Sequence, residues 1–254
     1  MKCLLPSAAV VLILCTPYNA QADEVTLVAP GGIRCPIERM APDFERASGH
    51  KIAATFGSGG ATRARVLGGE PFDVGIVQPP QQDVVASGKV VATSEKPLAT
   101  VTVVVGVRKG DPKPDISNAE AVKRMFLSAN GITYPAWQDG KGSYTGLSVD
   151  NTLKKLGIFE EMQPKIKRVQ GVNSAQLLAK KEIDVALAFG SEMRSTEELE
   201  VVGALPAEIS TPTGFIGFIG AQAKAPAAAQ ALLSYLSAPA AAAAYRACVM
   251  EPSR

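Results

Sequence analysis

"KIAATFGSGGATRARVLGGEPFDVGIV", residues 51–77, places a glycine-rich loop between two short apolar runs. Residues 51–56 and 72–77 have the length and composition of strands, and residues 61–67 between them suit a helix. A strand, a loop, a helix and a strand in this order are typical of a parallel α/β sheet. Glycines in such a loop let the backbone come close to a neighbouring group. The stretch therefore predicts an α/β fold and makes the loop a candidate binding element.

The same alternation of strands and helices extends along the chain. Residues 24–29 read as a strand before a helix at about residues 36–47, and a second series of α/β units follows residue 110. One long β-type run, residues 98–110, lies between the two series of units. Another, residues 213–222, follows the second series. They would let the chain cross from one lobe to another and return.

We therefore expect an α/β protein of two lobes, each with a mixed, mostly parallel sheet flanked by helices. Lobe 1 would comprise residues 23–103 and 217–254, and lobe 2 residues 104–216. The carboxyl ends of both sheets would open toward one cleft between the lobes. Ligands of open α/β sheets bind at such a place.

The first 22 residues have the pattern of a secretory signal peptide. Lys2 precedes a short apolar core at residues 4–15, and Ala20, Gln21 and Ala22 fit the cleavage rule. The core is too short to span a bilayer. We expect cleavage after Ala22 and a periplasmic mature protein.

The composition argues against several classes of function. The formal charge is +2, from 26 basic and 24 acidic residues, and aromatic residues make up 6%, so no nucleic acid partner is expected. His50 is the one histidine, and no Cys/His spacing suits a metal, so we expect neither a catalytic triad nor a metal or other cofactor. Cys35 and Cys248 could pair in an oxidising compartment or remain two buried thiols.

Three loops are candidates for binding an anion: residues 29–35, 56–62 and 143–148. Each opens a helix, whose first N–H groups lack partners within the helix. The glycine loop lacks both the Gly-Lys-Ser/Thr ending of a P-loop and the spacing of a dinucleotide site. Any single loop is explained as a tight turn, but three in one cleft indicate an anion cradle. Asp73 and Glu192 could also face this cleft.

Longer stretches resemble the molybdate-binding proteins of ABC importers, which are type II periplasmic binding proteins. The resemblance lies in residues 44–76, 143–169, 183–193 and 227–245. It implies the two-lobed type II periplasmic binding protein fold. It also implies an anion between the lobes, held by backbone N–H and hydroxyl groups.

The residues matched to the family's site depart from the molybdate pattern. The serines of the first and second loops fall on Gly32 and Gly59, and the ligand-binding tyrosine falls on Phe189. Thr145 keeps its hydroxyl in the third loop. The resemblance and the neighbouring residues together give the expected ligand-binding set: Gly32, Arg34, Ser58, Gly59, Gly60, Tyr144, Thr145, Gly146, Val172, Asn173 and Phe189.

These departures favour an organic anion over molybdate. Three hydroxyl donors are missing, and each hydrogen bond to a charged ligand would contribute ~1.5–3 kcal/mol. The missing side chains would leave room, and the guanidinium of Arg34 suits a carboxylate. We expect an exported, monomeric solute-binding protein that delivers a small anion, a di- or tricarboxylate, to an ABC permease in the inner membrane.

The alternative is a periplasmic isomerase on the same scaffold. Aconitate isomerase is similar to these binding proteins and acts on a tricarboxylate. Moving the double bond of this substrate requires a base that removes a proton and an acid that returns one. Tyr144, Thr145 and Glu192 are polar candidates, but spacing alone identifies no catalytic residue.

Overall fold

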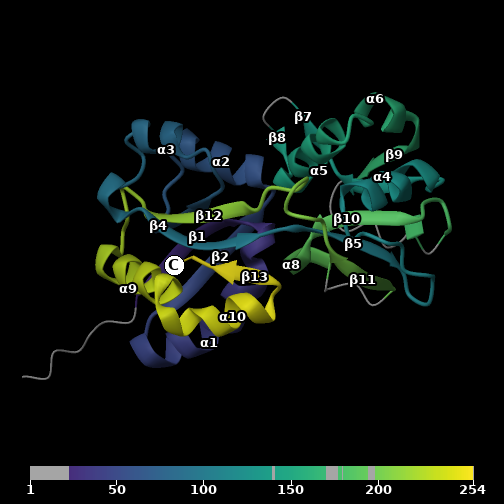
Figure 1. Ribbon diagram of the computed structural model, residues 1–254. Coiled ribbons are helices and arrows are strands. Elements are labelled where there is room, and N and C mark those ends of the chain that lie inside the picture. Colours follow the sequence, from purple (N-terminus) through teal and green to yellow (C-terminus); the bar gives the residue numbers. More distant parts are fainter. Residues whose placement is uncertain (1–22, 139–140, 170–176, 179, 194–197, 254) are drawn as a thin grey trace, which may run out of the picture.

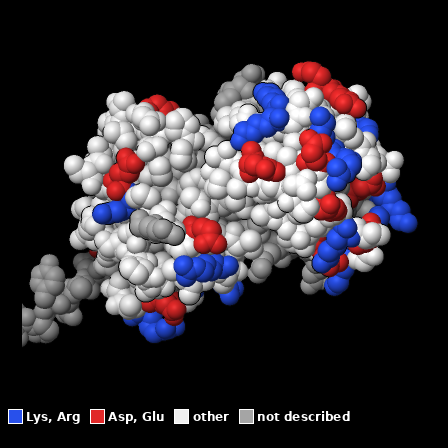
Figure 2. All heavy atoms as spheres, in the orientation of Figure 1, with Lys and Arg blue, Asp and Glu red and all other residues white. Residues whose placement is uncertain are grey.

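The computed structural model describes residues 23–138, 141–169, 177–178, 180–193 and 198–253, so the expected signal peptide lies outside the described residues. Two lobes lie side by side, each built on one sheet with helices packed against it (Figure 1). On the face in Figure 2, acidic and basic side chains are interspersed on both lobes. Within the described part of the chain, none of the helices combines the length and apolar composition that crossing a membrane requires.

The sheet of lobe 1 has the strand order β13-β4-β12-β3-β1-β2. Its strands are β1 (Glu24–Pro30), β2 (Lys51–Gly57), β3 (Val74–Val77), β4 (Lys96–Val101), β12 (Thr213–Ile219) and β13 (Met250–Pro252). Its helices are α1 (Arg34–Ser48), α2 (Gly59–Gly68), α3 (Gln82–Ala86), α9 (Pro226–Ser237) and α10 (Ala242–Ala247).

The sheet of lobe 2 has the strand order β11-β5-β10-β6-β9. Its strands are β5 (Val103–Arg108), β6 (Ile132–Pro135), β9 (Ile166–Val169), β10 (Val185–Phe189) and β11 (Leu199–Ala204). Its helices are α4 (Ala119–Ser128), α5 (Tyr144–Lys155), α6 (Phe159–Met162) and α8 (Gly190–Met193). A small hairpin, β7 (Trp137–Gln138) and β8 (Lys141–Gly142), precedes α5.

Strand pairing confirms the α/β class and places the loops. Strand β1 pairs in parallel with β2 and β3, and β6 pairs in parallel with β9 and β10. Strands β4, β5, β11, β12 and β13 add antiparallel pairs, so the sheets are mixed, with more antiparallel pairing than the α/β units alone predict. The carboxyl ends of β1, β2 and β3 therefore lie at one edge of their sheet, as do those of β6, β9 and β10.

The chain passes between the two sheets twice. It leaves the first sheet after Val101, enters the second at Val103, and returns at Thr213. The lobe boundaries at 103/104 and 216/217 remain a proposal. Strand β12 begins at Thr213, before the proposed boundary at 216/217.

Packing of apolar faces holds the helices on the sheets. Helix α1 buries Ile37, Met40 and Phe44, which recur every three or four residues, and Phe44 packs on Tyr235 of α9 at 5.4 Å between ring centroids. The sequence predicts a kink or break at Pro42, but α1 continues across it. Pro42 lies on the exposed side of the helix, where water can satisfy the carbonyl that the proline leaves unbonded.

A disulfide joins Cys35 at the start of α1 to Cys248 after α10, with 6.0 Å between their Cα atoms. Of the two alternatives that the sequence leaves open, a disulfide or two buried thiols, the structure has the disulfide. Because the two cysteines are 213 residues apart, the chain-entropy treatment assigns the bond about 5 kcal/mol of stabilisation, at the top of the usual range.

Candidate anion-binding site

Loops at the carboxyl ends of the two sheets meet between the lobes, in a region that we call the interlobe site. It comprises residues 31–34, 57–60 and Gln78 of lobe 1 and residues 143–146 and 189–192 of lobe 2. Within the expected ligand-binding set, the structure places Gly32 beside Phe189 and Gly59 beside Tyr144. Val172 and Asn173 lie outside the described residues.

Direct contacts join the lobes at this site. The Ser191 hydroxyl donates to the Gly32 carbonyl at 2.6 Å, which ties α8 to the loop after β1. The Arg63 guanidinium of α2 reaches the Tyr144 hydroxyl of α5 at 3.5 Å. Loops from both lobes therefore shape one site.

The first loop faces aromatic rings. A Cβ added at Gly32 would lie 3.0 Å from Cζ of Phe215 and 3.2 Å from Cδ2 of Phe189. The expectation that a missing side chain leaves room here is therefore wrong, because the two rings occupy that space. The result is a closely packed apolar contact, with Phe189 2% and Phe215 1% exposed, where the resemblance to molybdate-binding proteins implies a serine.

The glycine loop opens α2 against a polar group and a ring. The Ser58 hydroxyl caps the helix by accepting from the Ala61 N–H at 3.2 Å. A Cβ at Gly59 would clash with Oε1 of Gln78 and lie 2.5 Å from Cδ2 of Tyr144. Here too the expected room is filled. The N–H groups of Gly59 and Gly60 occupy the first helical positions, where the helix supplies no acceptor and an anion can bind.

The third loop begins α5. Ser143 caps the helix by accepting from the Thr145 N–H at 3.2 Å. Gly146 is required by packing, because a Cβ there would clash with the carbonyl of Pro135. Tyr144 is 7% exposed and packs edge-on against Trp137, with ring centroids 4.9 Å apart. Its burial raises the pKa of its hydroxyl above the ordinary value.

Glu192 of α8 places a carboxyl group between the loops of the two lobes. It accepts from the buried Thr145 hydroxyl at 3.3 Å, and its Oε1 lies 3.9 Å from a Cβ added at Gly31. Burial raises the pKa of Glu192 above its ordinary value and outweighs hydrogen bonds from Thr145 and the Phe189 backbone, which lower it. Such a carboxyl can exchange a proton at a pH closer to neutrality than an exposed one.

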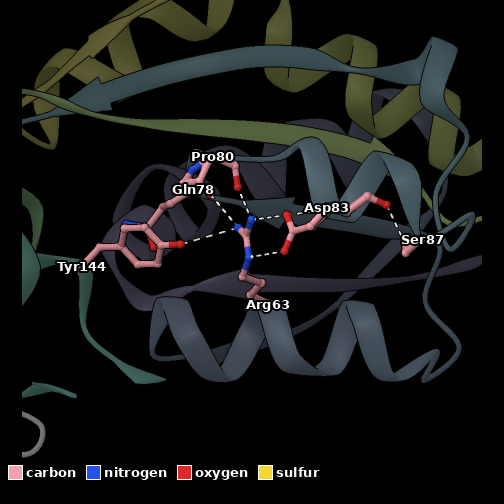
Figure 3. Close-up of polar contacts among 7 residues, drawn as sticks. Arg63, Gln78, Pro80, Asp83, Ser87 and Tyr144 are labelled. Atoms are coloured by element: carbon pink, nitrogen blue, oxygen red, sulfur yellow. Dashed lines mark hydrogen bonds and ion pairs between the residues drawn. The ribbon is translucent and has the colours of Figure 1, made fainter. Parts of the chain in front are cut away.

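Sequence reasoning missed Arg63, which holds the end of β3 in place. Its guanidinium donates to the carbonyl of Gln78 at 3.0 Å and to that of Pro80, and it pairs with Asp83 (Figure 3). With the hydrogen bonds from Nε to Asp83 and from Nη1 to the Tyr144 hydroxyl, all three guanidinium nitrogens of Arg63 are used. Arg63 lies four residues after Gly59 in α2 and so on the same face of the helix, and this spacing could have indicated that it is near the site.

Arg34 has a more open setting. It lies on the first turn of α1, with its side chain 53% exposed, stacked at 4.6 Å over the Phe56 ring. Its Nη1 is 3.7 Å from Glu38, a surface pair that contributes little. A role for Arg34 in ligand binding stays a prediction.

The expectation that Asp73 could face the cleft is wrong. It precedes β3, at the amino end of the strand and so at the edge opposite the interlobe site. Its carboxylate accepts from Thr26, Lys224 and Ala225, which makes it a structural group. His50 lies at the same end of the sheet, where its Nδ1 accepts from the Asp23 N–H at 3.2 Å.

The chain matches the bacterial extracellular solute-binding protein family over residues 25–247. It belongs to this family. Among similar proteins, aconitate isomerase of a Pseudomonas species is 30% identical over 244 residues, which are 92% of this chain and 91% of the relative. Molybdate-binding protein ModA of Azotobacter vinelandii is 25% identical over 227 residues, 87% of this chain and 86% of the relative.

A solved structure shares the fold of this chain. The periplasmic molybdate-binding protein of Azotobacter vinelandii superposes with a TM-score of 0.74 at 18% identity, covering 91% of this chain and 100% of that chain. The expected two-lobed periplasmic binding protein fold is therefore confirmed for this solute-binding protein. The resemblance to molybdate-binding proteins is confirmed with it.

Proposed function

We propose that the interlobe site binds a small organic di- or tricarboxylate for delivery to an ABC permease. The observation that carries the proposal is the chemistry at Gly32 and Gly59, where aromatic rings and an amide fill the space of side-chain hydroxyls. A tetrahedral oxyanion presents oxygen on every side and gains nothing from the rings of Phe189 and Phe215. The carbon skeleton of an organic acid has no hydrogen bonds to lose where it lies beside these rings.

Backbone groups supply the attraction for the anion. The first N–H groups of α2 and α5 lie at the positive ends of two helix dipoles, which favour a negative ligand. A carboxylate between them would contact both lobes, so the closed form would gain contacts that an open form lacks. The proposal includes a periplasmic, monomeric protein from which residues 1–22 have been removed.

A thermal-shift panel on the purified chain of residues 23–254 tests the proposal. It compares molybdate, tungstate and sulfate with citrate, cis-aconitate and trans-aconitate. A ligand at 100 times its Kd adds ~2.7 kcal/mol, or about 5–10 °C for a chain of this size. A shift with a tricarboxylate is the expected result, whereas a shift with the inorganic oxyanions alone would contradict it.

The change Arg34→Ala is expected to weaken binding of the tricarboxylate by about tenfold or more, through loss of a charge-assisted hydrogen bond. Isothermal titration calorimetry measures the Kd. Arg39→Ala is the matched control, since Arg39 is an exposed arginine on the same helix. Equal Kd values for Arg34→Ala and the control would remove Arg34 from the site.

Glu192 favours a second candidate function, the isomerisation of an unsaturated tricarboxylate. A binding protein gains nothing from a carboxyl of raised pKa beside its anion, but a proton-transfer enzyme does. The similarity to aconitate isomerase supports the same candidate.

The reaction needs one proton to move within the substrate. The Glu192 carboxylate would take a proton from the methylene carbon next to a substrate carboxylate, and the electron pair would delocalise across the double bond. The resulting carboxylic acid would return the proton to the former vinyl carbon. Helix N–H groups would stabilise the charge that develops on the substrate carboxylates.

A further inference from the structure

Gln78 is the residue of the interlobe site whose polar group has no evident structural use. It follows β3 directly, so it lies at the same sheet edge as the loops after β1 and β2. The side chain is 3% exposed, and within the described part of the chain its Oε1 has no hydrogen-bond partner. Burying an amide without a partner costs free energy, so its retention calls for an explanation.

The position of the amide supplies that explanation. Its Oε1 lies against Gly59, at the first turn of α2, and the Tyr144 ring lies on the same side of that glycine. The N–H groups of Gly59 and Gly60, two buried residues, lie in the first turn of α2, where the helix supplies them no acceptor. Two independent features, this helix start and a buried amide oxygen without a partner among the described residues, therefore converge on one point.

Hydrogen bonds hold the backbone of Gln78, whereas none from the described residues holds its Oε1. Arg63 donates to the Gln78 carbonyl at 3.0 Å and to the Pro80 carbonyl, and Asp83 holds Arg63 in turn (Figure 3). A half-turn about the last torsion of Gln78 exchanges the amide oxygen and the NH₂ group. The side chain can thus present two donor hydrogens to a ligand from a fixed anchor.

We propose that the Gln78 amide donates to a carboxylate of the ligand held at the start of α2 and so selects for it. The inference rests on the proposed function and adds a specificity-determining contact to it. A planar carboxylate can accept from the amide NH₂ and the helix N–H groups together. The residue does no chemistry on the ligand.

The test compares Gln78→Met and Gln78→Glu with the wild-type chain by calorimetry, using trans-aconitate, citrate and molybdate as probes. Methionine keeps the size of the side chain but removes its donors, and glutamate also adds a like charge. Both changes are expected to weaken tricarboxylate binding by about tenfold or more. Gln81→Met is the control, because the Gln81 amide already donates to Glu95 at 2.8 Å.

A second measurement, thermal unfolding without ligand, works whichever probe binds. Removing an unsatisfied amide is expected to leave the melting temperature of Gln78→Met equal to or above that of the wild type. A lower melting temperature together with an unchanged Kd would show a structural glutamine and overturn the inference. Wild-type binding of molybdate alone would overturn the proposed function. A weaker molybdate Kd in Gln78→Met would then show a donor contact from Gln78 but overturn its selection for a carboxylate. If no probe binds, a melting temperature of Gln78→Met below that of the wild type would overturn the inference.

Discussion

Glu192→Gln is expected to slow the conversion of cis-aconitate to trans-aconitate by about 10²–10⁴-fold, the range for loss of a general acid or base. Glutamine keeps the size of the side chain and can accept from Thr145, whose hydroxyl lies 3.3 Å from the carboxyl. It cannot take up and return a proton. Binding of the substrate is expected to change far less than the rate.

Proton NMR of the reaction mixture measures both isomers directly. Glu160→Gln is the matched control, since Glu160 is exposed on α6, away from the interlobe site. An unchanged rate in Glu192→Gln would exclude Glu192 as the proton-transfer group. A wild-type protein that binds cis-aconitate and releases it unaltered would leave ligand capture as the function.

The raised pKa of Glu192 predicts a stability effect that needs no substrate. The folded state holds the proton more tightly than the unfolded state does. Stability is therefore lost as the pH rises from the unfolded pKa to the folded one. Glu192→Gln removes this loss, so its advantage in the free energy of unfolding over the wild type should grow with pH across that interval and then level off.

Local sequence patterns were sufficient to predict the framework of the site. The apolar runs and glycines of residues 51–77 predicted β2, α2 and β3 with ends displaced by two residues or fewer. Helix α2 begins at Gly59 rather than at residue 61, because the Ser58 cap compensates for the weak helix propensity of glycine. These features depend on neighbours in the sequence.

What fills the site depends on contacts between distant residues. Phe215 closes the space beside Gly32, although the two residues are far apart in the chain. Gln78 could be suspected only after β3 was placed beside β1, and the Cys35–Cys248 pair likewise required the folded ends of the chain. A glycine in place of a serine therefore cannot be read as empty space from sequence alone.

Asp73→Ala is expected to lower the free energy of unfolding by about 3–5 kcal/mol, which urea denaturation measures. Asp73 is 2% exposed, and Oδ2 accepts from the Thr26 N–H at 2.8 Å and hydroxyl at 2.6 Å. Its Oδ1 accepts from the N–H groups of Lys224 at 2.7 Å and Ala225 at 2.9 Å. Alanine would leave these partly buried donors, which join β1, β3 and the start of α9, without an acceptor.

The dependence of this effect on pH separates the charge from the packing. Burial by itself raises the pKa of Asp73, but the hydrogen bonds from Thr26, Ala225 and Lys224 outweigh it and hold the pKa below its ordinary value. Because the folded pKa is the lower one, the stabilisation is present above the unfolded pKa and is lost as the pH falls through the folded pKa. The difference in the free energy of unfolding between wild type and Asp73→Ala should therefore shrink in acid.

Asp43→Ala is the control, since Asp43 is 66% exposed in a surface pair and should change the free energy of unfolding by about 0.5 kcal/mol or less. A loss in Asp73→Ala no larger than in this control would show that the carboxylate does not join these elements.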